Sequence, residues 1–232
     1  WGAFPIEGWR NVGKAAYSPD WSHGVTADAG ESGAVALYRL LWRHEAEHWR
    51  DQGCHIHSAG AYVTDSALAE ALGLLSFGRI MMEAAFPTGT LAATLGSPAR
   101  SDSIVVRRAL PADARLLAGM NRELDRHIAA SPIFFPDPHG LGEEEWREWL
   151  PRGGSVAFIA LTIDGPLGYI KAEAPQIDVS WSVHGSGTLA INGMFVDPAV
   201  RGRGIATSLL AALVRSGVRH TCLLYTSPSP RD

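Results

Sequence analysis

The sequence is short of cysteine, of excess charge and of long apolar runs. Only Cys54 and Cys222 occur among 232 residues, and neither a signal peptide nor an 18-residue apolar stretch is present. We therefore expect a reducing, cytoplasmic setting and no disulfide scaffold or membrane-spanning helix. The formal net charge is −4, with 19% charged residues, which argues against general binding to nucleic acid or to a membrane surface. A small molecule is the expected partner.

Apolar residues make up 46% of the chain, which is enough for one large globular domain or two small ones. The composition of residues 96–102, G-S-P-A-R-S-D, is typical of a linker. The sequence thus predicts a first domain at residues 1–95 and a second at residues 103–221.

The most informative stretch is Ile191 to Gly217. An apolar run, Ile191 to Val196, is followed by Asp197-Pro198, a glycine-rich turn, and a segment in which apolar residues repeat along one helical face. This pattern predicts a strand, a loop and a helix. The repeating residues are Ile205, Leu209 and Leu213.

The loop between this strand and helix has the chemistry of an anion site. The first backbone N–H groups of a helix have no partner within it, and they form an anion site together with the positive end of the helix dipole. Gly202 and Gly204 have no Cβ to hold a ligand away, while Arg201 and Arg203 add charge-assisted donors. A pyrophosphate fits this description.

Arg201-Gly202-Arg203-Gly204-Ile205-Ala206, with its lead-in Val196-Asp197-Pro198, resembles the R/Q-x-x-G-x-G/A loop of the GNAT (GCN5-related) N-acetyltransferase superfamily. The resemblance implies that the loop holds the pyrophosphate of acetyl-CoA, the co-substrate, and that the strand before it pairs with the pantetheine arm. The alternative is a glycine-rich turn of another α/β protein. The residues expected to bind the co-substrate are Met194, Phe195, Val196, Arg201, Gly202, Arg203, Gly204, Ile205, Ala206 and Thr207.

The rest of the second domain fits the same resemblance. I-V-V-R-R-A-L-P-A-D-A, starting at Ile104, resembles the first strand and helix of GNAT domains, and strands are expected at residues 155–162, 167–174 and 187–196. In the family, the region of the proline-bounded loop with Phe134 and Phe135 overhangs the acceptor. The alternative for these two aromatics is a place in the core.

The first domain reads as helix, strand, helix, strand at residues 34–52, 55–63, 67–75 and 79–86. That order resembles the degenerate first domain of tandem GNAT proteins, so we expect it to form a scaffold or walls of the acceptor site. The expected fold class is α/β (α+β). It consists of two GNAT-like domains, each with a mixed, mostly antiparallel sheet flanked by helices.

The resemblance implies transfer of an acyl group, most simply acetyl, to a primary amine of a small molecule or peptide. The catalytic residues are not identified: the family often places a glutamate base where this chain has Asn192, and Glu173 on the neighbouring strand is a weak substitute. A tyrosine acid would lie beyond Thr221. A non-catalytic acyl-CoA-binding module is the alternative function.

A third function class comes from His44-Glu45-Ala46-Glu47-His48, which satisfies the H-E-x-x-H pattern of zinc peptidases. His55 or His57 would be the third ligand. Against this, Glu47 and the flanking Arg43 and Arg50 indicate a solvated helix face. We therefore expect no metal.

Both ends of the sequence are unusual. It begins at Trp1 without Met, so we expect a first domain without its beginning, and we expect the second to be cut near Thr221. Residues Cys222 to Asp232 match, codon by codon, the translation of a transposase adapter used to build sequencing libraries. We expect this segment to be an artefact that neither packs nor functions.

Overall fold

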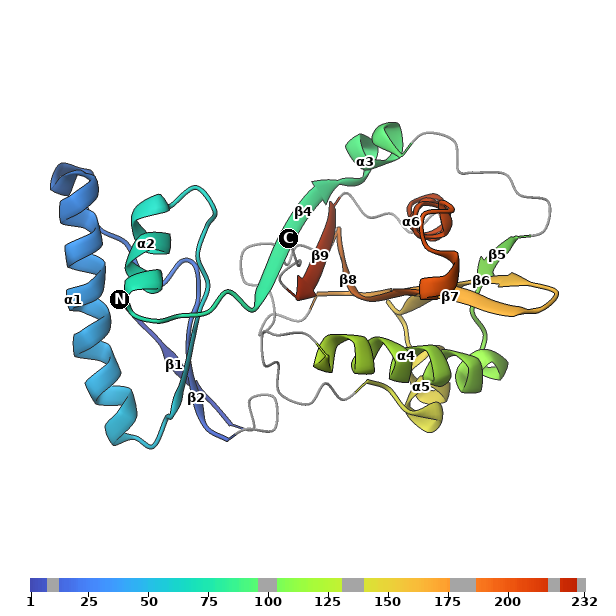
Figure 1. Ribbon diagram of the computed structural model, residues 1–232, viewed down its shortest axis with the longest axis horizontal. Helices are drawn as coiled ribbons and strands as arrows, with labels where there is room; N and C mark the ends of the chain where they lie inside the picture. Colours follow the sequence, from blue (N-terminus) through green and yellow to red (C-terminus); the bar gives the residue numbers. More distant parts are fainter. Residues whose placement is uncertain (8–12, 96–103, 131–139, 176–186, 217–221, 229–232) are drawn as a thin grey trace. The chain divides into compact units, whose positions relative to one another are not determined.

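The structure, a computed structural model, describes residues 1–7, 13–95, 104–130, 140–175, 187–216 and 222–228. The chain divides into two compact units, Trp1–Arg79 and Ile80–Asp232, and each is considered by itself (Figure 1).

Unit 1 combines a three-stranded sheet with two helices. The sheet has the order β1-β2-β3, in which β1 is antiparallel and β3 parallel to β2. The helices pack on each other through small and aliphatic side chains and Tyr38. Asp65 caps the second helix by accepting from Leu68 N at 2.9 Å, and its other oxygen accepts from the Tyr38 hydroxyl at 2.7 Å. The elements are β1 (Phe4–Ile6), β2 (Ala15–Ser18), α1 (Gly30–Asp51), β3 (Ile56–Ala59) and α2 (Ser66–Leu74).

Unit 2 is built on a six-stranded sheet of order β4-β9-β8-β7-β6-β5. Neighbouring strands are antiparallel except β8 and β9, which are parallel. Helices α4 and α5 cover one face and α6 the other (Figure 1). The elements are β4 (Met81–Pro87), α3 (Thr88–Thr94), β5 (Val105–Arg108), α4 (Ala114–Ala129), α5 (Glu143–Trp149), β6 (Val156–Thr162), β7 (Gly165–Glu173), β8 (Thr188–Val196), α6 (Ile205–Arg215) and β9 (Cys222–Pro228).

The central strands of unit 2 are buried on both faces. Ile159 on β6 and Tyr169 on β7 pack against α4 and α5, while their neighbours Phe158 and Ile170 pack on the α6 side. This follows from the two-residue period of a strand, which sends successive side chains to opposite faces. Side chains of β7 at positions 169, 171 and 173 therefore share the α4/α5 face.

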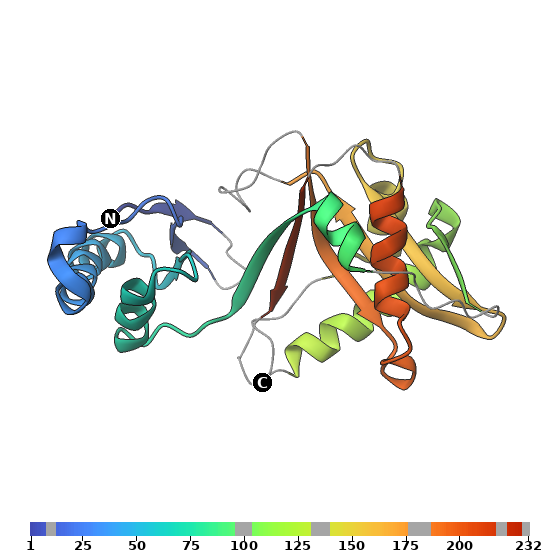
Figure 2. The same ribbon diagram turned by 90° about the horizontal axis from the view of Figure 1, so that it is seen from above.

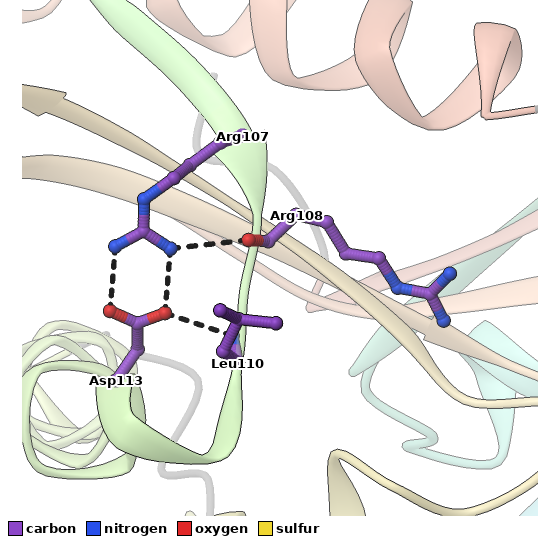
Figure 3. Close-up of polar contacts among 4 residues, drawn as sticks. All are labelled: Arg107, Arg108, Leu110 and Asp113. Atoms are coloured by element: carbon purple, nitrogen blue, oxygen red, sulfur yellow. Dashed lines mark hydrogen bonds and ion pairs between the residues drawn. The ribbon is translucent and has the colours of Figure 1, made fainter.

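An ion pair joins the end of β5 to the start of α4 (Figure 3). Arg107 donates two parallel hydrogen bonds of 2.7 Å to the two oxygens of Asp113, and Leu110 N donates to Asp113 Oδ2 at 2.8 Å. Bidentate geometry fixes both the distance and the angle between the partners. The pair holds the turn before α4 in place.

The mixed α/β fold expected from the sequence is present, and the expected helices and strands lie within a few residues of their predicted positions. One difference concerns β4, which we expected in a first domain at residues 1–95. It pairs with β9 inside unit 2, and the units divide at residues 79 and 80. The linker at residues 96–102 lies outside the described residues. A tandem pair of GNAT-like domains stays a prediction.

A second difference concerns the segment Cys222–Asp232, which we expected not to pack. Its residues Cys222–Pro228 form β9, which lies between β8 and β4 and pairs with both. Backbone hydrogen bonds make this pairing, and any residue can form them, except that proline has no N–H to donate. The slot between β8 and β4 therefore accepts a strand whatever the origin of its sequence.

Candidate functional site

The site begins where two parallel strands separate. β9 pairs with β8 from Thr188 to Ile191 only, whereas it pairs with β4 along its whole length. Beyond Ile191 no strand among the described residues pairs with the edge of β8 that faced β9, and Figure 2 shows the two strands diverging there. Residues 192–196 thus present backbone groups on that edge to an extended ligand, which could add to the sheet as a strand does.

A bulge marks the same point on the other edge of β8. Lys171 on β7 faces Gly193, whereas the next residue, Ala172, faces Ile191, so Asn192 is the extra residue. A bulge bends its strand and re-aims a side chain. Here Asn192 Nδ2 donates to Glu173 Oε1, on the α4/α5 face of the sheet.

The glycine-rich loop leads from β8 into α6. Asp197 accepts from Ala199 N at 2.8 Å, and Gly202 and Gly204 both have φ of +77°, which favours glycine. Gly204 is the N-cap of α6, and no side chain caps the first turn of this helix. The N-terminal backbone donors of α6 therefore have no side-chain acceptor, as the predicted anion site requires.

The two arginines of this loop are exposed. Arg201 Nε donates to Val196 O at 3.1 Å, which folds its side chain back toward the end of β8. No atom lies within 4 Å of the position that a Cβ would take at Gly202. The loop therefore combines open space and positive charge at the start of a helix, and these features fit a pyrophosphate.

The predicted co-substrate residues form one continuous stretch from the end of β8 to the first turn of α6. Within it, Phe195 is buried in the α4/α5 core, Met194 and Val196 pack on the α6 side, and Ile205 is buried. Their side chains serve packing, which leaves the backbone of β8 as the surface for an extended ligand.

Glu173 and Asn192, the two weak catalytic candidates, are in direct contact. Asn192 donates to Oε1 of Glu173, and the indole Nε1 of Trp149 on α5 lies 2.9 Å from Oε2. Both oxygens of the carboxylate are thus held by donors from other elements. Trp149 is a partner that sequence reasoning missed, because its contact spans 24 positions of the chain.

Lys171 is the other residue that sequence reasoning missed. Its Nζ lies 5.7 Å from the ring centroid of Trp146 and 5.4 Å from that of Trp149, within the range of cation–π contacts. Burial lowers the pKa of Lys171, although the carboxylates of Glu173 and Asp125 act in the opposite direction. The two-residue period of β7 could have found it, since Lys171 lies between Tyr169 and Glu173 on one face.

Tyr169 does not supply the tyrosine acid that the resemblance implies. Its hydroxyl is buried and donates to Asn121 Oδ1 at 3.1 Å, and burial raises the pKa of Tyr169 above its usual range. Asn121 in turn donates to Asp125 Oδ2 at 3.0 Å. This chain of hydrogen bonds connects β7 to α4 and is structural.

Two other candidates from the sequence have different outcomes. Phe134 and Phe135 lie outside the described residues. His44 and His48 are exposed on α1, and His48 Nε2 lies 2.9 Å from the side-chain nitrogen of Gln52. In the part of the chain that the structure describes, no three His, Cys, Asp or Glu side chains come together as metal ligands would.

One comparison with known proteins covers the glycine-rich loop. Residues 124–229 match the model of the acetyltransferase (GNAT) family. No curated protein matches the chain. Within the described residues, no helix is both long and apolar enough to cross a membrane.

Solved structures resemble parts of the chain at low identity. The aminoglycoside N-acetyltransferase AAC(6')-Iy in complex with CoA is 21% identical over 55% of this chain and 78% of its own, with a TM-score of 0.40. An aminoglycoside acetyltransferase from an uncultured soil metagenomic sample is 22% identical over 50% and 72%, with a TM-score of 0.37. A functionally unknown protein from Staphylococcus epidermidis is 11% identical over 94% and 75%, with a TM-score of 0.48. These TM-scores are too low to transfer an acceptor to this chain.

Proposed function

We propose that the protein is an acyl-CoA-dependent N-acyltransferase that transfers acetyl from acetyl-CoA to a primary amine, because residues 124–229 match the model of the acetyltransferase (GNAT) family. One observation carries the proposal: the bulge at Asn192, the open edge of β8 that begins there and the uncapped start of α6 follow one another along the chain. Together they offer an extended thioester a strand edge to pair with and an anion site at one end.

The proposed contacts follow from the local chemistry. The loop from Arg201 to Gly204 and the first N–H groups of α6 would bind the pyrophosphate. The backbone of Met194 to Val196 would pair with the amide groups of the pantetheine arm, as one strand pairs with another. The acyl group would then lie near the bulge, beside Glu173.

Glu173 is the proposed general base. An amine is protonated near neutral pH, so it must lose a proton before its nitrogen can attack the thioester carbon. Trp149 and Asn192 fix the carboxylate in one orientation. Asn192 therefore acts as a positioning residue, since its amide cannot accept the proton itself.

The alternative is a module that binds acyl-CoA without catalysis. The contact between Glu173 and the bulge favours catalysis, because binding the nucleotide and pantetheine would not need a carboxylate at that place. The acceptor is proposed only as an amine of a small molecule or peptide, and the cytoplasm is the proposed location. Unit 1 is proposed to be a scaffold.

Calorimetry with acetyl-CoA tests the first half of the proposal. Arg201→Ala removes a charge-assisted contact, so we expect affinity to fall by about 1.5–3 kcal/mol. Gly204→Val forces a branched residue into φ of +77°, and its side chain would occupy the anion site, so binding should be lost. Arg215→Ala, an exposed arginine in the last turn of the same helix, is the matched control.

Turnover tests the second half. Thiol release from acetyl-CoA with a panel of amines should fall about 10²- to 10⁴-fold in Glu173→Gln, the usual contribution of a general base. Acetyl-CoA affinity should stay the same. Asp164→Asn, an exposed carboxylate in the β6–β7 turn, is the control. Tight binding without turnover in the wild-type protein would favour the binding module.

A further inference from the structure

Lys171 and Glu173 are opposite charges on the same face of β7, and yet they form no ion pair. Side chains two positions apart on a strand have Cα atoms about 7 Å apart, which two flexible side chains can bridge. Glu173 is instead held by Trp149 and Asn192. The hydrogen bonds of its carboxylate are therefore made with these two side chains and not with Lys171.

The ammonium of Lys171 forms no ion pair among the described residues, although the carboxylates of Glu173 and Asp125 are near enough to act on its pKa. Its Nζ makes no hydrogen bond or ion pair with them, and its contacts are the ring faces of Trp146 and Trp149. An ammonium carries three donors, and a partly buried one without acceptors is costly. A hydrophobic residue at this position would pack on the two indoles without that cost.

This combination is accessible to a ligand. Asn192 is exposed, and Lys171 and Glu173 are partly exposed. Gly193 also brings Lys171 to the bulge: Lys171 faces Gly193 across the β7–β8 pair, and a Cβ at Gly193 would meet its side chain. Both charges therefore lie beside the position proposed for the reacting acyl group.

We propose that Lys171 and Glu173 together select acceptors that carry a carboxylate next to the reacting amine, of which free α-amino acids are the simplest class. Glu173 receives the ammonium of the acceptor, and Lys171 binds its carboxylate. The acceptor would make a charge-assisted hydrogen bond at each end. Trp146 and Trp149 form an apolar wall beside this pair.

This inference rests on the proposed function, since it names the acceptor of that site. The reaction is the same one. The acceptor ammonium loses one proton to Glu173, and its nitrogen bonds to the thioester carbon. The carbon–sulfur bond breaks, CoA leaves as the thiolate, and the thiolate takes up the second proton that the nitrogen loses. Lys171 makes no covalent bond and acts on recognition.

The test compares matched acceptors in the full chain. Thiol release from acetyl-CoA is measured with free α-amino acids, with the carboxamide of each, and with the amine that lacks the carboxylate. An aminoglycoside is included as a polycationic acceptor. We expect kcat/KM to favour the amino acid by at least about tenfold over both analogues, mainly through KM, because the difference is one charge-assisted contact.

Two variants, Lys171→Met and Lys171→Arg, then test whether the preference for the carboxylate comes from Lys171. In Lys171→Met the preference for the carboxylate should fall to about one, while thermal stability rises, because an unpartnered ammonium is replaced by a side chain that packs on the indoles. Lys171→Arg should restore part of the preference. Arg152→Gln, which removes an exposed arginine 3.9 Å from Glu148, should change neither quantity.

Equal kcat/KM for all three kinds of acceptor, or a preference for the aminoglycoside that Lys171→Met leaves unchanged, would overturn the inference and leave the proposed function intact. Binding of acetyl-CoA without turnover on any amine would overturn both.

Discussion

Gly193 and Lys171 fit together only because residue 193 has no side chain. A Cβ at Gly193 would lie 2.9 Å from Lys171 Cε, closer than Cβ atoms approach other atoms in proteins, and 3.0 Å from Cγ, which is tighter than most such contacts. The stem of Lys171 thus lies directly over the glycine at the bulge. The same contact ties the position of the lysine to the backbone of β8.

Gly193→Ala should therefore displace Lys171. Because the atoms in the way belong to a flexible side chain, we expect a modest loss of stability, about 1–2 kcal/mol, and a clear loss of preference for carboxylate-bearing acceptors. Urea denaturation and the acceptor panel measure the two effects. Gly119→Ala in α4, where no atom lies within 4 Å, should instead gain up to about 1 kcal/mol from helix propensity. An unchanged acceptor preference in Gly193→Ala would contradict the contact.

The Arg107–Asp113 pair should contribute measurably to the stability of unit 2. Asp113→Ala removes a bidentate partner and leaves Leu110 N without its acceptor, so we expect a cost of about 1–3 kcal/mol in urea denaturation. Arg126→Ala, which breaks an exposed pair with Glu123, should cost less than about 1 kcal/mol. Similar losses of stability in both variants would show that the Arg107–Asp113 pair stabilises unit 2 no more than an exposed ion pair does.

The same pair predicts a pH dependence at the acid end. The hydrogen bonds from Arg107 are the main cause that lowers the pKa of Asp113 below its ordinary value of 3.8. The folded chain thus holds this carboxylate ionised more strongly than the unfolded chain does. Its contribution is present above pH 3.8 and is lost as pH falls through the lower folded value. In Asp113→Asn, the free energy of unfolding should fall less steeply at acid pH than in the wild-type protein. An equally steep fall in the variant would show that Asp113 is not its cause.

His57 in unit 1 should titrate far below a normal histidine. Burial is the main cause that lowers its pKa from 6.5 to about 4, and the nearby His23 adds to this. Trp42 Nε1 donates to His57 Nδ1 at 2.8 Å, so Nε2 carries the proton and donates to Ser18 Oγ at 2.8 Å. The buried ring is therefore neutral, because His57 Nδ1 must be without a proton to accept from Trp42.

The sign of the effect follows from linkage. The unfolded chain takes up a proton at His57 near pH 6.5 and the folded chain only near pH 4. The free energy of unfolding should therefore fall as the pH is lowered from 6.5 to 4, and the full contribution of the neutral ring is present above pH 6.5. An NMR titration of the His57 ring measures the pKa directly. His57→Gln should weaken the decline, and the exposed His48→Gln should leave it unchanged. A ring titration near 6.5 would contradict the burial of His57.

Deletion of residues 222–232 distinguishes two views of the end of the chain. In the structure β9 pairs with β8 and with β4, so its removal should leave two open strand edges and cost unit 2 several backbone hydrogen bonds. Hydrogen exchange should then show loss of protection in β4 and in the first half of β8. Full protection after deletion would support the adapter origin suggested by the codons and show that β9 does not support the fold.

Local sequence features allowed the strand, turn and helix around the glycine-rich loop to be predicted, while its binding of a co-substrate stays a prediction. Its strand, turn and helix are consecutive, and the apolar period of residues 205, 209 and 213 and the glycines at 202 and 204 carry the signal within 27 residues. The family match later covered the same stretch. Element positions elsewhere could be predicted for the same reason, because the hydrophobic period needs no knowledge of distant residues.

The tertiary structure alone decided what surrounds Glu173. Trp149 lies on α5, a helix that precedes β7 in the chain. Asn192 is oriented by a bulge that depends on the register of β7 and β8. Lys171 could be recognised as part of the site only from its contacts with the two indoles on α5. The position of β4 beside β9 could not be predicted from the sequence either, because it depends on pairing between strands more than 130 residues apart. Long-range pairing and side-chain convergence depend on which surfaces exclude water together, and no period or motif in one stretch encodes that choice.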